Sequence, residues 1–388
     1  MKKIFIILSR DPRSAQVLMF LINALLKKNY HIHLFYNRSK ITNDAYGELD
    51  FKNNNIETHP FDVGSSNKLN FIVKTLEIIK KFNIIKPTHI IAVDKKTLFI
   101  VFFLNFFKKK FNKIHMILDF DYPKNESIKE SLITKIQFFF SRYVDLFLFP
   151  STKRAKKFFQ LSTINDKNFT ILSNHFPKNF KPEVSNKLNQ ILNDKNIKYS
   201  KIVCSLGTIG HNHYFPELIR SVSQWEDGVI LIIGGWPTKN AKEPLIKIIS
   251  EKNLQKKVLI LSDISEKLWC EILLKSYLGI CFYKQDSISN QYMAGPSTKL
   301  SNYLLANIPF IACDNDDFRA FNLKYNLCEL VNPLEPIDIS NKINTLINNK
   351  EKYNLLKKNS RIAFSESLNF DVQFQKLYEK LIILEQDY

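Results

Sequence analysis

The sequence predicts an α/β protein made of two doubly wound domains. Its 388 residues exceed the length that one domain usually holds. Short apolar runs alternate with segments of helical periodicity in both halves of the chain. This alternation stops once, in a polar stretch that contains Pro177 and Pro182, and then begins again. Because parallel sheets with helical crossovers produce such alternation, we expect each half to form its own sheet.

The first half predicts six buried strands. After the first of them comes a helix, in which Val17, Phe20, Leu21, Ala24 and Leu25 recur at the spacing of one apolar stripe. The expected strands cover residues 4–8, 32–36, 89–93, 114–118, 146–149 and 170–172. We therefore expect an N-terminal Rossmann-like domain over residues 1–177.

The second half predicts six more strands after a linker at residues 178–200. These strands cover residues 202–206, 229–233, 258–261, 278–282, 309–313 and 327–331. They predict a C-terminal Rossmann-like domain over residues 201–368. The chain then closes with a helix at residues 369–388, in which Phe374, Leu377 and Leu381 share one face.

Composition excludes several classes of protein. Hydrophobic residues make up 45% of the chain and charged residues 24%, which is the range of globular rather than disordered proteins. Five cysteines without a C-x-x-C pair argue against a disulfide framework or a cysteine zinc site, and fit a reducing cytoplasm. Motifs of metalloproteases, esterases, P-loop NTPases and dinucleotide-binding dehydrogenases are missing from the sequence.

Positive charge is concentrated in the first half. Residues 1–177 hold 29 basic and 14 acidic residues, a net +15, whereas residues 178–388 hold 27 and 23, a net +4. A field of this sign attracts polyanions such as nucleic acids or anionic lipids. Because no nucleic-acid-binding motif accompanies the charge, lipid is favoured. The alternative is a solvating surface that reflects biased composition.

A Phe-rich run followed by three lysines, LFIVFFLNFFKKKFNK at residues 98–113, resembles a membrane-surface element. It is too short to span a bilayer, but it could lie in the headgroup layer with Lys108, Lys109 and Lys110 facing anionic lipid. The alternative is a buried helix with a cationic last turn. A second Phe-rich basic stretch at residues 135–142 favours peripheral membrane association.

A loop at residues 295–298 leads into a helix that could hold phosphate. Pro296 and Ser297 suit the start of a helix, where free N–H groups and the dipole attract anions, and Lys299 adds a full charge. The alternative is that Ser297 is only a helix cap.

The same segment, PSTKLSNYLLANIPFIA at residues 296–312, resembles the P-S-K-L-x-E-Y-L-A-x-G-x-P-V-I-A segment of GT-B glycosyltransferases, especially family 4 and its relatives. Further segments resemble that family in the expected order, at residues 9–13, 144–151, 170–177, 205–210 and 232–235. The resemblance implies two Rossmann-like domains facing a cleft, with the C-terminal helix crossing back to the first domain.

The resemblance also implies an activity of the hexosyltransferase type. A sugar would move from a nucleotide diphosphate donor, of the UDP or GDP type, to an acceptor hydroxyl, without a metal ion or cofactor. Preorganised N–H groups and a lysine can stabilise the departing diphosphate in such a reaction. The donor-binding residues implied are Gly207, Thr208, His213, Ser297, Thr298, Lys299 and Asn302.

The sequence departs from the family pattern at several positions. The Glu-x7-Glu pair of family 4 falls on Ala294 and Asn302, so neither carboxylate is present. The usual glycine before the last strand is Asn307. No Arg/Lys pair follows Gly207, and His213 lies in that stretch instead, either as a phosphate ligand or as a surface loop residue.

The catalytic residues implied are Asp121 and Asp119. The loop at residues 118–123 is similar to the family's D-x-H-E-x-x-P loop, with Asp121 at the histidine position. A carboxylate there could act as a general base or stabilise charge, or both aspartates could form structural salt bridges. Arg10 and Arg13 could grip an acceptor phosphate, or could be ordinary solvated residues.

We expect the acceptor to be a lipid-linked glycan or another surface-polysaccharide precursor, as in capsule or lipopolysaccharide synthesis. An anionic acceptor would explain the basic first domain, and a cytoplasmic protein at the inner face of the plasma membrane would meet it. Two alternatives stay open. One is a catalytically silent scaffold subunit, and the other is a sugar-nucleotide epimerase on the same fold.

Overall fold

The computed structural model describes residues 2–38, 53–62, 68–105, 110–120, 128–165 and 167–386. The chain forms two compact units. Unit 1 comprises Met1–Asn174 and Phe370–Tyr388, and unit 2 comprises His175–Asn369. Residues 178–200, which we expected to be a linker, belong to unit 2 and contain the short helix α6 (Leu188–Asp194).

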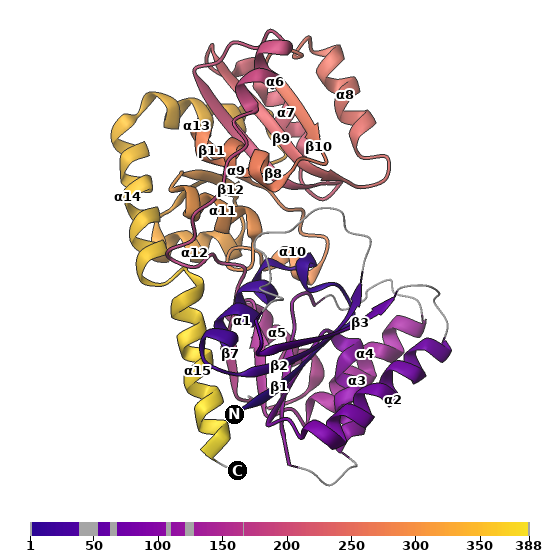
Figure 1. Ribbon diagram of the computed structural model, residues 1–388. Coiled ribbons are helices and arrows are strands. Elements are labelled where there is room, and N and C mark those ends of the chain that lie inside the picture. The colour runs from indigo at the N-terminus through magenta and orange to yellow at the C-terminus, as the bar shows by residue number, and fades with distance from the viewer. Residues whose placement is uncertain are drawn as a thin grey trace. The chain divides into compact units, whose positions relative to one another are not determined.

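Unit 1 holds a seven-stranded sheet in the order β3-β2-β1-β4-β5-β6-β7, and every neighbouring pair of strands is parallel (Figure 1). This is the doubly wound order, in which the strand sequence reverses between β1 and β4. The elements of unit 1 are β1 (Lys3–Leu8), η1 (Pro12–Ser14), α1 (Gln16–Lys27), β2 (His31–Arg38), β3 (Ile56–Asp62), α2 (Lys68–Ile85), β4 (His89–Val93), α3 (Lys95–Leu104), β5 (Asn112–Met116), α4 (Ile128–Ser141), β6 (Leu146–Phe149), α5 (Thr152–Ser162), β7 (Phe169–Ile171) and α15 (Phe370–Gln386).

Helices cover both faces of this sheet, which is why its central strands are almost purely apolar. Helices α2, α3 and α4 lie side by side on one face, and α1 and α15 pack together on the other (Figure 1). Glu385 of α15 accepts hydrogen bonds from His89 Nε2, at 2.9 Å, and from the Tyr30 hydroxyl, at 2.8 Å. The C-terminal helix therefore returns to the first unit, as the sequence predicted.

Unit 2 repeats the arrangement with a six-stranded parallel sheet in the order β10-β9-β8-β11-β12-β13. Its order reverses between β8 and β11. Besides α6, its elements are β8 (Lys201–Ile209), α7 (Phe215–Ser221), η3 (Val222–Gln224), β9 (Val229–Pro237), α8 (Lys242–Glu251), β10 (Val258–Ser262), α9 (Glu266–Lys275), β11 (Leu278–Cys281), α10 (Ile288–Gln291), α11 (Thr298–Ala306), β12 (Phe310–Cys313), α12 (Asp316–Tyr325), β13 (Cys328–Val331), α13 (Pro336–Asn348) and α14 (Lys350–Glu366).

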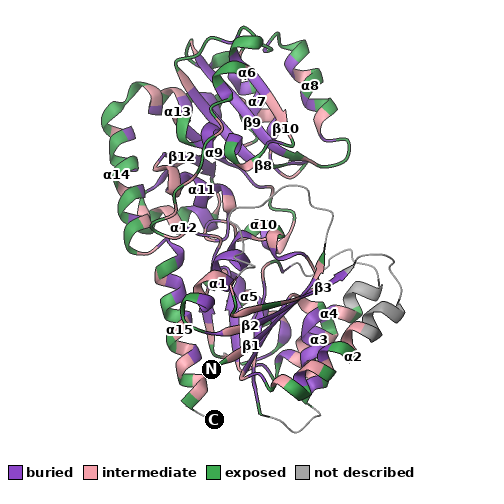
Figure 2. Cartoon of the chain, in the orientation of Figure 1, coloured by how far each residue is buried: buried purple, intermediate pink, exposed green. Residues whose placement is uncertain are grey.

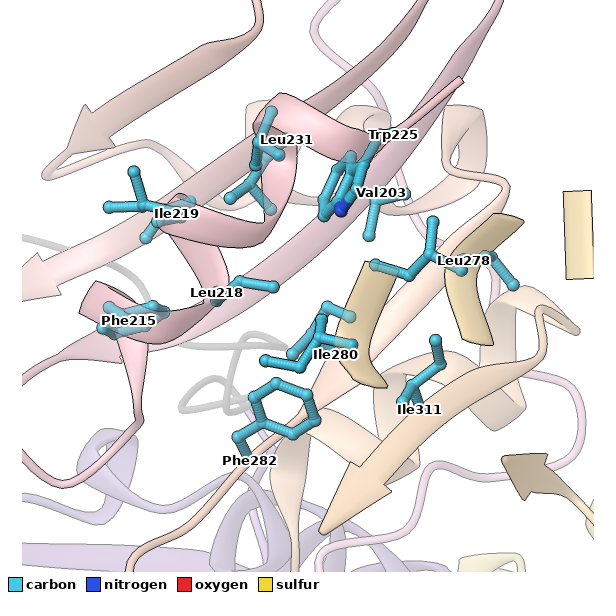
Figure 3. Packing of buried hydrophobic residues seen from close by; sticks show 14 of the residues in the cluster. Val203, Phe215, Leu218, Ile219, Trp225, Leu231, Leu278, Ile280, Phe282 and Ile311 are labelled. Carbon is cyan, nitrogen blue, oxygen red and sulfur yellow. The ribbon is translucent and has the colours of Figure 1, made fainter. Parts of the chain in front are cut away.

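The largest buried cluster of unit 2 joins its strands to helices α7, α8, α13 and α14. Phe215 and Leu218 of α7 pack toward Val203, Leu231 and Ile280 of the strands (Figure 3). The strands are mostly buried, and exposed residues lie chiefly on the helices and loops (Figure 2). All five cysteines are buried and unpaired, in agreement with the prediction that no disulfide framework exists.

The structure contains every strand that the sequence predicted, and one that it did not. Strand β3, with the sequence IETHPFD, alternates polar residues with few apolar ones and includes Pro60. It lies at the edge of the sheet, where a residue without an N–H group is tolerated. Edge position therefore explains why neither apolar content nor β-propensity indicated this strand.

The first part of the Phe-rich run, residues 98–104, lies in helix α3, which has a buried face, and residues 112–113 begin strand β5. Leu98, Val101 and Leu104 of α3 are buried in unit 1, whereas Phe103 is exposed. Lys108 and Lys109 lie outside the described residues. Among the helices of the described chain, none is long and apolar enough to cross a membrane.

Candidate functional site

In sheets of this topology, ligands bind beyond the carboxyl ends of the strands, where the strand order reverses. The protein has two such places. The unit 2 switch point lies after β8 and β11, and the unit 1 switch point lies after β1 and β4. Most of the residues that the sequence singled out lie at one of these two points.

At the unit 2 switch point, the side chain of Lys299 crosses the backbone of Gly207. Gly207 of β8 has φ +148°, and a Cβ on it would lie 3.1 Å from Lys299 Cε. Gly235 on β9 is equally constrained, because a Cβ there would lie 1.8 Å from the Gly207 oxygen. Two glycines thus let β8, β9 and the lysine approach closely. Thr208 follows Gly207 and is exposed.

Lys299 is a buried cation with few partners. Its ammonium donates to Ser205 Oγ at 3.2 Å and lies 5.3 Å from the centre of the Phe215 ring and 5.6 Å from that of Tyr283. No carboxylate in the described ranges forms an ion pair with it. Burial lowers the pKa of Lys299 to about 8, so the side chain is still mainly charged at neutral pH. An ammonium in this position is expected to attract an anion.

Ser297 caps helix α11. Its Oγ accepts a hydrogen bond from Leu300 N at 3.1 Å and lies 2.8 Å from the Tyr283 hydroxyl. The residue is fully buried, and its hydrogen bond to Leu300 N is that of a helix cap, which is the alternative given above for Ser297. Thr298, the first residue of the helix, is partly exposed and keeps its side chain nearer to solvent.

Asn302 is the most unusual polar group of the site. It is fully buried, and neither its Oδ1 nor its Nδ2 has a hydrogen-bond partner in the described part of the chain. A buried amide without partners destabilises a fold by ~1–3 kcal/mol, which makes it a candidate for a ligand contact. The neighbouring residues Ser301 and Asn307 also hold unpartnered buried oxygens among the described residues.

His213 is buried, which excludes the alternative that it is a surface loop residue. Its Nδ1 lies 2.9 Å from the Phe282 oxygen, so Nδ1 carries the proton and Nε2 is left as an acceptor. Burial lowers the pKa of His213 to about 3, so the ring is neutral at physiological pH. A neutral imidazole can accept a hydrogen bond but adds no positive charge for a phosphate.

The unit 1 switch point carries an ion pair that the sequence did not predict. Arg10, after β1, donates from Nε and Nη2 to the two carboxylate oxygens of Asp94, each at 3.0 Å, and Ser9 Oγ donates to the same carboxylate at 3.1 Å. Asp94 follows β4 with φ 73° and ψ 163°, a region that is essentially restricted to glycine. Strain of this kind is concentrated at functional sites.

The other residues predicted in unit 1 are also paired. Arg13 donates from Nε and Nη2 to the buried carboxylate of Asp11, both at 2.9 Å. The guanidinium groups of Arg10 and Arg13 are therefore already paired with carboxylates. A phosphate could form the same two hydrogen bonds to either arginine only by displacing the carboxylate. Asp119 is exposed and lies 3.6 Å from Arg154 Nη1. Asp121 lies outside the described residues.

Sequence reasoning missed Asp94, Arg154 and Ser205. Asp94 had a usable signal, because it directly follows the predicted strand at residues 89–93 and therefore had to lie at the carboxyl edge of the sheet. Ser205 lies inside a buried strand, where a small polar residue needs a partner. Arg154 had no such signal, since a basic residue in a helix is usually exposed.

No protein-family model matches the chain, and no curated protein matches it in sequence. Solved structures do match. One is HepE of Anabaena in complex with UDP and glucose, with a TM-score of 0.74 and 16% identity over 98% of this chain and 99% of that one. Another is sucrose-phosphate synthase of Thermosynechococcus elongatus, with a TM-score of 0.72 and 13% identity over 99% of this chain and 100% of that one.

A third match is WaaG, a glycosyltransferase involved in lipopolysaccharide biosynthesis, with a TM-score of 0.63 and 11% identity over 96% of this chain and 98% of that one. The chain has the GT-B fold. At these identities the likeness establishes the fold alone, which agrees with the fold that the sequence predicted.

Proposed function

We propose that this protein is a glycosyltransferase that uses a nucleotide diphosphate sugar and binds it in unit 2. The buried ammonium of Lys299 carries the proposal, because this residue of the first turn of α11 packs against Gly207 and has no carboxylate partner in the described chain. A diphosphate would supply the missing negative charge. The fold supports this proposal, since HepE has been solved with UDP-glucose.

The proposed donor site matches the chemistry of glycosyl transfer. As the sugar leaves, negative charge grows on the diphosphate, and Lys299 together with the first N–H groups of α11 would stabilise it. Asn302 would donate to and accept from the ribose through the amide atoms that are unpartnered in the described chain. None of these contacts requires a metal ion, so we propose metal-independent transfer.

Calorimetric titration with UDP and with GDP tests the donor site. We expect wild-type protein to bind one of them, and Lys299→Met to lose most of that affinity while keeping the volume of the buried side chain. Lys247→Ala is the control, since Lys247 lies exposed on α8. A protein that binds neither nucleotide would support the scaffold alternative, whereas equal binding in Lys299→Met would remove Lys299 from the donor site.

Product analysis separates transfer from epimerisation. An epimerase changes the sugar nucleotide in the absence of any acceptor, whereas a glycosyltransferase releases the nucleoside diphosphate only when a hydroxyl or water receives the sugar. We place the acceptor in unit 1, where Asp119 is an exposed carboxylate and Asp94 is held by Arg10. Asp119→Asn should therefore bind UDP like wild type but transfer sugar more slowly.

We further propose that unit 1 associates with anionic membrane surfaces and receives a lipid-linked acceptor. Helices α3 and α4 share a cluster of aromatic rings, in which Phe102 and Phe140 stack at 4.0 Å between ring centres. Phe103, Phe139 and Tyr143 of this cluster are 41%, 49% and 47% exposed. The same stretches of chain also hold exposed basic residues, namely Lys96, Lys110, Lys135 and Arg142. Aromatic rings beside cations suit the headgroup layer.

Co-sedimentation with vesicles of phosphatidylglycerol and phosphatidylcholine tests this surface. Phe103→Ser with Phe139→Ser should reduce binding, and Lys135→Gln with Arg142→Gln should reduce it more at low salt than at high salt. Leu323→Ser is the control, because Leu323 is 90% exposed on α12 of unit 2. Binding that is the same in all these variants would contradict the proposed surface.

A further inference from the structure

Three metal-ligating side chains converge in unit 1, on the face of the sheet next to helix α2. They are His33 on β2 and Glu57 and His59 on β3. His33 pairs in register with Glu57, and residues paired across neighbouring parallel strands point to the same face. His59 lies two residues after Glu57 and so shares that face as well. Strand β3, which the sequence did not predict, thus brings Glu57 and His59 next to His33, although His33 is distant from them along the chain.

The ligand atoms of this cluster all lie within 4.8 Å of one another. His33 Nδ1 lies 3.4 Å from His59 Nε2 and 3.2 Å from Glu57 Oε2, and His59 Nε2 lies 3.4 Å from Glu57 Oε1. A tetrahedral ion with bonds of about 2.1 Å separates its ligand atoms by roughly 3.4 Å. The two ring nitrogens therefore already have the spacing of two corners of such a site, and the carboxylate has one oxygen close to each of them.

We propose that His33, Glu57 and His59 bind one divalent transition-metal ion of the zinc class. Two imidazoles and one carboxylate are a ligand set that zinc uses with a fourth position for water. The ion would join β3 to β2 and so hold the edge strand on the sheet. This site belongs to unit 1 and is independent of the proposed donor residues, all of which belong to unit 2.

Access suits metal binding, because the two histidine rings are buried while the carboxylate of the cluster is exposed. Glu57 is about half exposed, at 48% of its side chain, which gives an ion a route from solvent. Lys81 of α2 lies 3.1 Å from Glu57 Oε1, and it can keep that contact while Oε2 binds the ion.

The alternative is a cluster held by hydrogen bonds alone, in which the two rings donate to the Glu57 carboxylate. Zinc titration of the chelator-treated full-length protein distinguishes the two. We expect one zinc ion per chain, measured by competition with a chromophoric chelator, and a higher unfolding temperature for the zinc form. Cobalt(II) at the same site should give the visible absorption bands of a four-coordinate ion.

Variants locate the ion. Glu57→Gln and His59→Gln should each weaken zinc binding by at least about 100-fold. Loss of a residue that only supports a metal ligand already weakens binding by about 10- to 100-fold, and loss of a ligand should cost at least as much. Glu57 is exposed enough for its variant to keep the fold, which circular dichroism checks. His31→Gln is the matched control, because the centre of the His31 ring lies 4.8 Å from that of His33 but His31 does not belong to the cluster of ligands. Failure of zinc to bind stoichiometrically, or unchanged binding in Glu57→Gln and His59→Gln, would overturn the proposal.

Discussion

Lys299 is the residue whose ionisation sets the charge beside Gly207. Burial lowers its pKa to about 8, so the ammonium loses its proton when the pH rises above that value. Neighbouring groups do not titrate in the same range. Burial raises the pKa of Cys204 to about 12 and that of Cys281 to about 11, and lowers the pKa of His213 to about 3. The lysine is therefore the group that responds between pH 7 and 9.

From this we predict that UDP affinity is constant near pH 7 and falls as the pH rises through about 8, by up to ~10-fold for each further pH unit. The sign follows from the charge, because only the protonated lysine attracts the diphosphate, and a bound diphosphate raises the lysine pKa. Calorimetry from pH 7 to 9 measures the effect. The Lys299→Met protein should show weak and pH-independent binding; a pH dependence that persists in it would assign the effect to another group.

Asn302 predicts opposite effects on stability and on binding. Its buried amide has no partner in the described chain, so Asn302→Leu removes an unsatisfied polar group of similar size. We expect the free energy of unfolding of unit 2 to rise by ~1 kcal/mol, and UDP affinity to fall. Ser301→Ala is the control, since it also removes an unpartnered buried oxygen but should leave UDP affinity unchanged. A variant that binds UDP normally would remove Asn302 from the donor site.

At the scale of elements, Tyr303 fixes helix α11 to the sheet. Its ring lies against Gly279, where a Cβ would be 2.5 Å from the ring carbons. Its hydroxyl lies 2.8 Å from the Ile280 oxygen and 3.2 Å from the Cys204 oxygen, and accepts from Ile280 N at 3.1 Å. One side chain thus links the helix to both strands at the unit 2 switch point.

We predict that Tyr303→Phe lowers the stability of unit 2 by ~1–3 kcal/mol, because it leaves buried backbone groups of β8 and β11 without their partner. Hydrogen exchange of the β11 amides, read by mass spectrometry, would report the change locally. Tyr325→Phe on α12 is the control, and it should leave exchange as in the wild type. Equal exchange in both variants would show that α11 is held by packing alone.

The elements also show how far sequence reasoning reaches. Apolar runs predicted the strands correctly because buried parallel strands need such runs, and β3 was missed because an edge strand does not. The motif around Lys299 could be read from the sequence, but its contact with Ser205 could not. Those two residues are 94 positions apart, and they meet only because the sheet order places β8 beside β11. Arg10 and Asp94 likewise meet because the sheet order places β1 beside β4.

At the scale of the whole molecule, Glu385 anchors the last helix to unit 1. It accepts from His89 and Tyr30 and also pairs with Lys2. We predict that Glu385→Ala lowers the stability of unit 1 by ~1–3 kcal/mol and leaves unit 2 unchanged. Hydrogen exchange, followed separately for β1 and β8, measures both units at once. The control is Glu379→Ala, on the same helix; if it destabilises unit 1 as strongly, the anchor is not specific to Glu385.

Unit 1 is assembled from two separated stretches of chain, with the whole of unit 2 between them. During synthesis on the ribosome, residues 1–174 emerge first but must wait for α15 to complete their fold. Unit 2 is contiguous and can finish earlier. A released chain that ends at residue 369 is therefore expected to carry a protease-resistant unit 2 behind a protease-sensitive N-terminal segment.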